Sequence, residues 1–211
     1  TDFLHYASAA LSFILKDVPV GVLVVGAQRS SDRGSSDAGM NLVCAAQFLA
    51  STQFTGVASC MHASIDDDAC YIIAGTHVRK MHSSRRDAFK PINDGPLAKV
   101  DFSSRKVDIL QSFPSDKHAD LPKNLPFINE DLKIGLLYSR PQLFAQELSL
   151  YEEFDGLVLA GSGLGQFPIN EIDESTKEHT LIFKKLKGLA QKVPVVMSTQ
   201  AINGRVHMNV Y

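Results

Sequence analysis

Residues 20–51 decide the fold class, and they read VGVLVVGAQRSSDRGSSDAGMNLVCAAQFLAS. The stretch opens with a continuous apolar and β-branched run over residues 20–25, which is typical of a strand buried on both faces of a parallel sheet. A polar loop follows at residues 28–36. Ser36 is placed to cap a helix over residues 37–51. A buried strand, a loop and a helix in this order predict an α/β protein.

The sequence predicts further helices and strands before and after this stretch. Residues 3–15 carry apolar residues at helical spacing, and Pro19 ends that segment. The buried face expected for the second helix consists of Met40, Val43, Cys44, Gln47 and Phe48. Further strands are expected at residues 56–61, 70–74 and 77–79, and a hairpin at residues 98–102 and 106–110.

The composition changes after residue 112. Prolines and charged residues gather in residues 113–131, which predicts an inter-domain linker between a first domain, residues 1–112, and a second one, residues 132–211. In the second domain, strands are expected at residues 132–138, 156–160 and 193–198, and helices at residues 142–153 and 175–191. The sequence therefore predicts two doubly wound, mainly parallel α/β units.

Composition narrows the range of functions. Hydrophobic residues make up 45% and charged residues 21%, so a folded globular protein is expected. The net charge of −2 excludes the broad basic surface of a domain that binds nucleic acid through its own charge, and leaves open a local basic patch or a nucleic-acid-binding partner. The histidines show no metal-binding spacing. The three cysteines form no CxxC pair, which favours a reducing, cytoplasmic setting.

The chain begins with Thr1 rather than with methionine. We therefore expect a chain that was processed or cut from something longer. No basic segment of a signal peptide precedes the first helix, and no run of about 18 apolar residues is present.

Three features could carry chemistry. The glycines of residues 161–165 follow a predicted strand, but their spacing differs from that of a phosphate loop, so a functional loop without a nucleotide is expected. Thr1 by itself could act as an N-terminal nucleophile, although such hydrolases are sandwiches of antiparallel sheets. The third feature is Thr1 and Asp2 together with Lys80, which follows the strand expected at residues 77–79. A lysine of lowered pKa can activate a hydroxyl, but a solvated surface lysine has the same sequence signal.

Four segments resemble the asparaginase/glutaminase family. In order, they are TDFLHYASAALSF at residues 1–13, VVGAQRSSDRGSSDAGMNL at 24–42, HVRKMHSSRRDAFKPIN at 77–93 and VVMSTQAINGRVHMNVY at 195–211. Within the family, the second and third segments look most like the branch formed by the amide-hydrolysing subunits of archaeal glutamyl-tRNA(Gln) amidotransferases. The resemblance implies an asparaginase-like fold with a flavodoxin-like first unit.

The resemblance also implies a reaction, the hydrolysis of a side-chain amide by two threonines, an aspartate and a lysine. Thr1, Asp2 and Lys80 match one threonine, the aspartate and the lysine. The other threonine, a mobile-loop tyrosine and a substrate-binding serine pair have no counterpart in the chain, which we therefore expect to be an inactive fragment of an active enzyme. Phe3 replaces the threonine usual after the Thr-Asp pair.

The branch implies partners as well. Glutamine or asparagine is the expected substrate, and a free-standing L-asparaginase or a non-catalytic scaffold are the alternatives. The ammonia is expected to pass to a GatE-type partner, which uses ATP and Mg to amidate Glu-tRNA(Gln). A second copy of the chain is the other expected partner, and no cofactor is expected in the chain itself.

Plainer roles remain open for several of these residues. Asp2 could cap the helix over residues 3–15. Arg29, Arg33, Arg85 and Arg86 could contact a carboxylate or tRNA phosphate, or form salt bridges within loops, and the second role is favoured. Cys60 is expected in the core of its strand.

Overall fold

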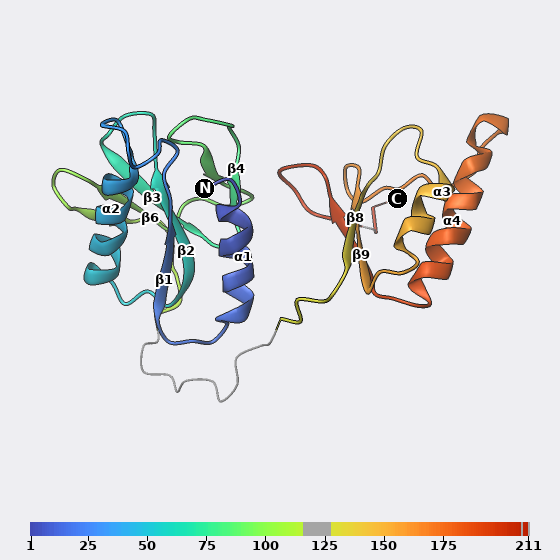
Figure 1. Cartoon of the computed structure of the whole chain (residues 1–211), viewed down its shortest axis with the longest axis horizontal. Helices are drawn as coiled ribbons and strands as arrows, with labels where there is room; N and C mark the ends of the chain where they lie inside the picture. Colours follow the sequence, from blue (N-terminus) through green and yellow to red (C-terminus); the bar gives the residue numbers. More distant parts are fainter. Residues whose placement is uncertain (116–127, 208, 211) are drawn as a thin grey trace. The chain divides into compact units, whose positions relative to one another are not determined.

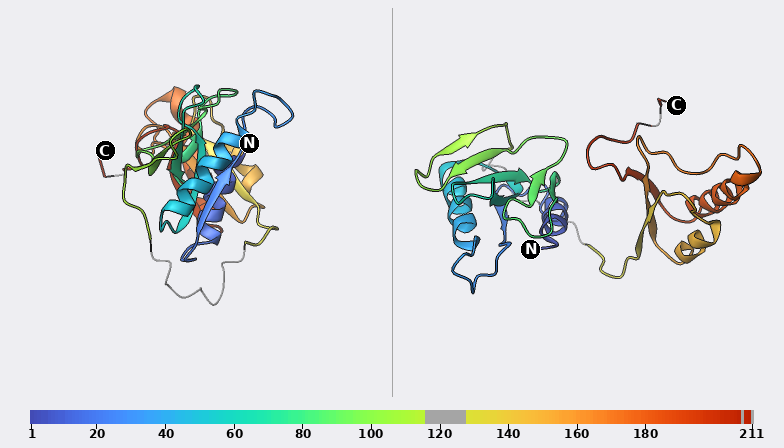
Figure 2. Two further views of the ribbon diagram at one scale, coloured as in Figure 1. Left: turned by 90° about the vertical axis from the view of Figure 1, so that its left-hand side faces the viewer. Right: turned by 90° about the horizontal axis from the view of Figure 1, so that it is seen from above.

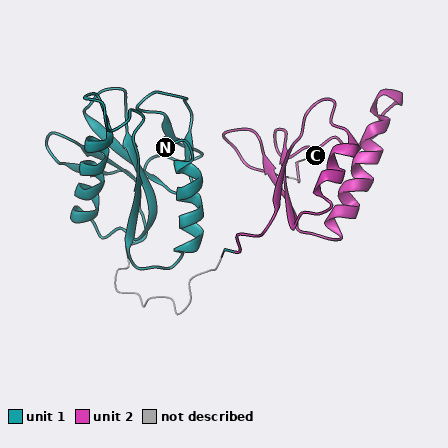
Figure 3. Cartoon of the chain, in the orientation of Figure 1, with its two compact units in different colours: residues 1–128 teal, residues 129–211 magenta. Residues whose placement is uncertain are grey.

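The computed structural model describes residues 1–115, 128–207, 209 and 210. The chain divides into two compact units, Thr1–Ile128 and Asn129–Tyr211 (Figure 3). Most of the linker expected at residues 113–131 lies outside the described residues. Phe113 packs against the core of the first unit, and the carbonyl of Pro114 accepts a hydrogen bond from Thr55 N at 2.8 Å.

A mixed sheet forms the centre of the first unit. In spatial order its strands are β1 (Gly21–Val25), β2 (Gly56–His62), β3 (Ala69–Ala74), β6 (Ala98–Asp101) and β7 (Val107–Ile109). β1 and β2 are parallel because a helix connects them, whereas β3, β6 and β7 each run antiparallel to the preceding strand of the sheet. The short loop at residues 63–68 joins β2 to β3 and leaves no length for a crossover.

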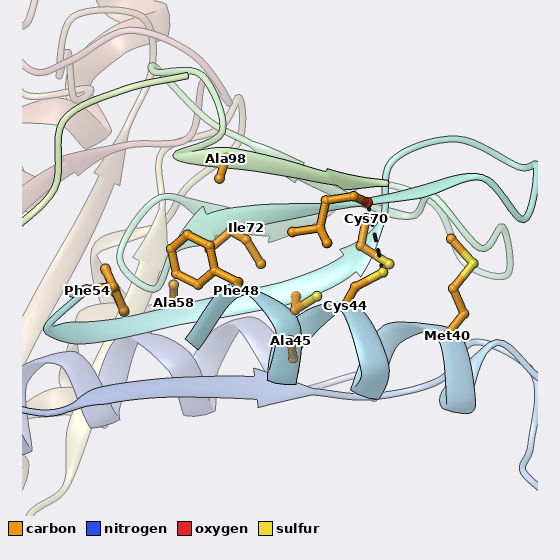
Figure 4. Packing of buried hydrophobic residues seen from close by; sticks show 11 residues of the cluster. Met40, Cys44, Ala45, Phe48, Phe54, Ala58, Cys70, Ile72 and Ala98 are labelled. Atoms are coloured by element: carbon orange, nitrogen blue, oxygen red, sulfur yellow. Dashed lines mark hydrogen bonds between the residues drawn. The ribbon is translucent and has the colours of Figure 1, made fainter. Parts of the chain in front are cut away.

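Two helices cover opposite faces of this sheet, as Figures 1 and 2 show. They are α1 (Leu4–Ile14) and α2 (Ala38–Ser51). α2 packs on β2, β3 and β6 through an apolar cluster that includes Phe48 and the buried thiols of Cys44, Cys60 and Cys70 (Figure 4). α1 packs on the other face through Leu4. The first unit therefore has two apolar layers, one on each side of the sheet.

The buried face of α2 differs from the expected one. Met40, Cys44 and Phe48 are buried as expected, but Val43 is exposed, and Asn41 and Ala45 are buried in addition. The prediction for Val43 was wrong. The spacing of apolar residues shows that one face of the helix is buried, but it does not determine the rotation of that face to within one residue.

Two further expectations about this stretch need correction. β1 is half-buried along its whole length rather than fully buried, since among the described residues it is an edge strand that pairs only with β2. Asp37, not Ser36, occupies the N-cap position of α2, and its side chain makes no capping hydrogen bond, whereas Ser36 Oγ accepts a hydrogen bond from Ala38 N at 3.2 Å.

A small second sheet lies beside the first, and only half of it was expected. β4 (Val78–Lys80) pairs antiparallel with β5 (Phe89–Pro91), so that Lys80 lies opposite Phe89. β5 escaped prediction because three residues that include a proline carry no strand pattern.

The second unit is a parallel sheet with helices on one face. The strands, in spatial order, are β10 (Val195–Thr199), β9 (Gly156–Gly161) and β8 (Ile134–Tyr138). The helical segments are α3 (Ala145–Leu148), η1 (Ser149–Tyr151), η2 (Glu174–Thr176) and α4 (Lys177–Ala190). α3 is shorter than the helix expected at residues 142–153, because Gln142 has a φ of 57° and residues after Leu148 adopt a 3-10 turn. The α/β class with parallel strands in both units is confirmed.

Candidate active site

The first predicted site residue, Thr1, joins two elements of the first unit. Its carbonyl accepts a hydrogen bond from Leu4 N at 3.0 Å at the start of α1. Its hydroxyl Oγ1 donates to the carbonyl of Ala27, just after β1, at 2.6 Å. Thr1 therefore connects the beginning of α1 to the carboxyl end of β1.

Asp2 and Lys80 form a direct ion pair. Lys80 Nζ lies 2.5 Å from Asp2 Oδ1, although 78 positions separate the two residues in the sequence. The side chain of Lys80 is 13% exposed and that of Asp2 is 81% exposed, so the lysine reaches from the protein body to a carboxylate at the surface. The expectation that Lys80 lies within hydrogen-bond reach of Asp2 or Thr1 is confirmed.

An apolar cluster beneath the pair explains why these distant residues meet. Leu4 of α1 is buried against Val78 of β4 and Phe89 of β5. The Lys80 ammonium also lies 5.9 Å from the centre of the Phe89 ring. Packing of α1 on the small sheet thus brings the start of the helix to the end of β4.

The surroundings of the pair shift the pKa values of two groups, Asp2 and His5. The hydrogen bond and the positive charge of Lys80 lower the pKa of Asp2 below its usual value, so this carboxylate is ionised at neutral pH. Burial, together with the charges of Arg79 and Lys80, lowers the pKa of His5. The candidate site is therefore a carboxylate–ammonium pair whose carboxylate belongs to the residue after Thr1, with an uncharged imidazole at His5.

The prediction that Asp2 caps the first helix was wrong. The capping position is occupied by Phe3, and no side chain makes a capping hydrogen bond there. The carboxylate of Asp2 is directed to Lys80 instead, since an ammonium partner offers a stronger, charge-assisted hydrogen bond than a backbone amide.

A hollow of about 420 Å³ adjoins Thr1 and Asp2. It is lined by the first turn of α1 and by the end of β1 through Gly26. A Cβ atom on Gly26 would lie 2.3 Å from Thr1 Cγ2, so only glycine permits this approach. Gly26 and Ala27 were not among the site residues expected from the sequence. The feature of the sequence that could have indicated them is a glycine directly after a predicted strand.

The arginines are engaged in loop contacts. Arg85 pairs with Asp87 at 2.8 Å, and Arg86 pairs with Asp67 at 2.7 Å. Arg29 donates to Ser35 Oγ at 3.2 Å, and Arg33 is exposed. The favoured salt-bridge role is thus seen for Arg85 and Arg86.

The glycine-rich segment at residues 161–165 is a tight loop at the carboxyl end of β9, as expected. Ser162 and Gln166 form an isolated β-bridge across it. Thr199, at the end of β10, donates its hydroxyl to the carbonyl of Gly163 at 2.5 Å. That this loop binds no nucleotide stays a prediction.

Three other expectations concern cysteines, metals and membranes. Cys60 is fully buried in the core, as expected. Within the part of the chain that the structure describes, histidine, cysteine and acidic side chains form no group of three or more suited to a metal ion. Among the same residues, no helix has the length and apolarity needed to cross a membrane.

Comparison with known proteins places this chain in a family. A model of the family "Asparaginase, N-terminal" matches residues 1–114. The GatD component of the glutamyl-tRNA(Gln) amidotransferase of Methanobrevibacter smithii is 41% identical over 213 residues, which cover 100% of the chain and 45% of that protein. The GatD component of the same enzyme from Methanococcus maripaludis is 38% identical over 216 residues, which cover 100% of the chain and 48% of that protein. The chain thus spans about half the length of the curated relatives it matches.

Solved structures agree with the family model. The thermostable L-asparaginase from Thermococcus kodakarensis matches with a TM-score of 0.78 and 28% identity, over 100% of the chain and 58% of that protein. A probable cytoplasmic L-asparaginase from Campylobacter jejuni matches with a TM-score of 0.74 and 26% identity, over 100% of the chain and 62% of that protein.

Proposed function

Because the chain belongs to the asparaginase family, we propose that it carries part of the active site of an amidohydrolase, which releases ammonia from the side-chain amide of glutamine or asparagine. The observation that carries this proposal is the 2.5 Å contact between Lys80 and Asp2, the residue that directly follows Thr1. These are the three residues that match the family's threonine, aspartate and lysine.

The chemistry of amide hydrolysis suits these groups. A nucleophile must add to the amide carbonyl, the C–N bond must break, and the leaving nitrogen needs a proton to depart as ammonia. We assign to Thr1 the role of nucleophile or of activator of the water that releases the acyl group. Asp2 holds the ammonium/amine group of Lys80 in place. In its amine form Lys80 accepts the hydroxyl proton as Thr1 Oγ1 adds to the carbonyl, and it gives that proton to the leaving nitrogen as the C–N bond breaks, so that ammonia departs and water then releases the acyl group. Thr1 presents its hydroxyl in a geometry held by Ala27, so little reorganisation is required.

We further propose that the protein containing these residues is the amidohydrolase component of a tRNA-dependent amidotransferase. The names of the relatives at 41% and 38% identity support this assignment over a free-standing L-asparaginase. In this proposal, ammonia passes to a GatE-type partner in the cytoplasm, which uses ATP and Mg to convert Glu-tRNA(Gln) to Gln-tRNA(Gln). A second copy of the chain completes the assembly.

The test replaces Lys80 in the protein as its gene encodes it. Lys80→Ala is expected to lower kcat for ammonia release from glutamine by roughly 10³-fold or more, because the members of a catalytic unit act together. Lys106→Ala is the matched control, since this lysine is 70% exposed in the same unit, and its kcat should equal that of the wild type. Circular dichroism verifies that both variants are folded.

Further measurements distinguish this proposal from a free-standing asparaginase. Wild-type kcat in Lys80→Ala would contradict the assignment. Full turnover without partner, tRNA or ATP, and no formation of Gln-tRNA(Gln) with them, would identify a free-standing asparaginase. The 211-residue chain alone is expected to release little ammonia, since it has no counterpart of the family's second threonine.

A further inference from the structure

Asn41 is a fully buried amide in the first turn of α2, and both ends of its side chain are hydrogen-bonded. Nδ2 donates to the carbonyl of Gly26 at 2.9 Å and to Asp37 Oδ2 at 3.2 Å. Oδ1 lies 2.6 Å from His62 Nδ1 and accepts from Cys70 Sγ at 3.3 Å. Since the two acceptors near Nδ2 require a donor, the orientation of the amide is determined by its surroundings.

Asp37, one turn earlier, holds the backbone of the loop after β1. Its carboxylate is 1% exposed and accepts from Gln28 N at 3.0 Å and from Arg29 N at 2.9 Å. A buried carboxylate is costly without such partners, so this contact favours one conformation of the loop strongly.

Buried His62 extends the network to the far side of the loop. Its Nε2 lies 3.0 Å from Asp67 Oδ1, and Asp67 pairs with Arg86 at 2.7 Å. Arg86 in turn donates to the carbonyl of Ser35 at 2.8 Å. The hydrogen bond to His62 and the charge of Arg86 lower the pKa of Asp67, which keeps this carboxylate ionised. The chain of contacts thus runs from Arg86 to Asn41.

These hydrogen bonds are made by the residues on both sides of Ala27. None of them is made by Ala27 itself. Asn41 holds the carbonyl before Ala27, and Asp37 holds the two amides after it. The carbonyl of Ala27 is the acceptor for the hydroxyl of Thr1. We propose that Asn41 is a positioning residue, through which Asp37 and His62 fix the Ala27 carbonyl and so orient the Thr1 hydroxyl.

The catalytic part of this inference rests on the proposed amidohydrolase function, whereas its structural part does not. Asn41→Asp keeps the size of the side chain but removes both Nδ2 donors and places a carboxylate against Asp37. The segment at residues 26–29 should then lose its attachment to α2, because two buried acceptors are left without donors and two like charges adjoin.

Hydrogen exchange of the 211-residue chain tests the structural part. In Asn41→Asp, the amides of Gln28 and Arg29 should exchange at least tenfold faster than in the wild type, relative to the amides of Ile72 and Ile73 in β3. Asp32→Asn removes an exposed carboxylate from the same loop and should leave these rates unchanged. Unchanged exchange of Gln28 and Arg29 in folded Asn41→Asp overturns the proposal.

A second variant keeps the test decisive if Asn41→Asp does not fold. Asp37→Asn should likewise accelerate exchange at Gln28 and Arg29. In the wild type, these two amides should exchange at least tenfold more slowly than that of exposed Ser31, and equal rates overturn the proposal.

Kinetics of the protein as its gene encodes it tests the catalytic part. Asn41→Asp and Asp37→Asn should lower kcat for ammonia release tenfold or more and change KM less than threefold, since the substrate still binds but the hydroxyl is misplaced. Faster exchange with unchanged kcat overturns the link to Thr1. If the wild type releases no ammonia, the function proposal fails, and the exchange experiment still decides whether Asn41 holds the loop.

Discussion

At Asp2 and Lys80, a single charge-assisted hydrogen bond joins the start of a helix to the end of a strand. The bond forms at the surface, where an isolated ion pair contributes little to stability. We therefore expect this pair to contribute little to the free energy of unfolding, and in the proposed function it serves the reaction instead. The ion pairs of a buried carboxylate in the first unit show the contrasting, structural use of charge.

Asp87 is such a structural carboxylate. It is 6% exposed and accepts hydrogen bonds from Arg85 Nε at 2.8 Å and from Lys90 Nζ at 2.8 Å. Burial raises its pKa, but the bonds and charges of Lys90 and Arg85 outweigh burial, so the net shift is downward. Because the folded-state pKa is lowered, the stabilisation exists above the unfolded-state pKa and is lost as the pH falls through the folded-state value.

Asp87→Asn is expected to lower the free energy of unfolding by about 1–3 kcal/mol at pH 7. The difference from the wild type should shrink as the pH falls below about 4, where Asp87 becomes protonated in the unfolded chain, and it should be lost once the pH has fallen through the lowered pKa of the folded state. Urea unfolding of the wild type and the variant at pH 7 and at a pH below about 4 measures this difference, with Asp66→Asn at an exposed position as control. A difference that persists undiminished at low pH would show that charge is not the cause.

At the scale of elements, connection length determines strand direction in the two sheets. The stretch between β1 and β2 contains α2, and this crossover makes the two strands parallel. The loops after β2 and β6 are short and return the chain antiparallel. Asp2 and Lys80 meet because α1 and β4 pack on one apolar cluster.

Alanine substitutions at two glycines of the second unit, one at the end of β9 and one in α4, should have opposite effects on stability. A Cβ on Gly161 would lie 2.7 Å from the backbone of Gly165, whereas a Cβ on Gly188 in α4 meets no atom within 4 Å. Gly161→Ala should destabilise the second unit by about 1–3 kcal/mol through overpacking. Gly188→Ala should stabilise it by about 0.5–1 kcal/mol, because alanine favours the helix.

Native-state hydrogen exchange of β9 amides measures both changes within the second unit. Equal effects of the two substitutions would mean that backbone entropy, rather than the close contact at Gly161, determines the outcome.

At the scale of the whole molecule, each unit has a core of its own. Phe48 is fully buried in the first unit, where its ring lies 5.5 Å from that of Phe54 and 5.6 Å from that of Phe113. Leu148, Leu157 and Ile182 form the centre of the other core. Cores that do not share residues predict units that unfold separately.

Phe48→Ala should therefore destabilise the first unit by about 3–5 kcal/mol through the cavity it leaves. Amide protection in β8 and β9 should stay at the wild-type level, as measured by hydrogen exchange of the 211-residue chain. Leu42→Ala is the control on the same helix, since that side chain is 62% exposed. Loss of protection in β9 together with that in β2 would show that the two units unfold as one.

The sequence by itself determined the class of the fold and supplied the candidates for the site residues. Apolar runs over residues 20–25 and 156–160 and the helical periodicity of residues 37–51 are local signals, and local signals are enough for strands and helices. The Thr-Asp pair at the start of the chain and the lysine at position 80 could be named from a motif, because motifs record residue types in order.

Only the tertiary structure decided how these parts meet. The rotation of α2 that buries Asn41 and exposes Val43 depends on packing against the sheet, and the pairing of Asp2 with Lys80 depends on α1 lying on β4. The contacts of Asn41 with Gly26, Asp37 and His62 join residues up to 21 positions apart. Hydrogen bonds of this kind have no periodic signature, because their energy depends on distance and direction in space rather than on separation along the chain.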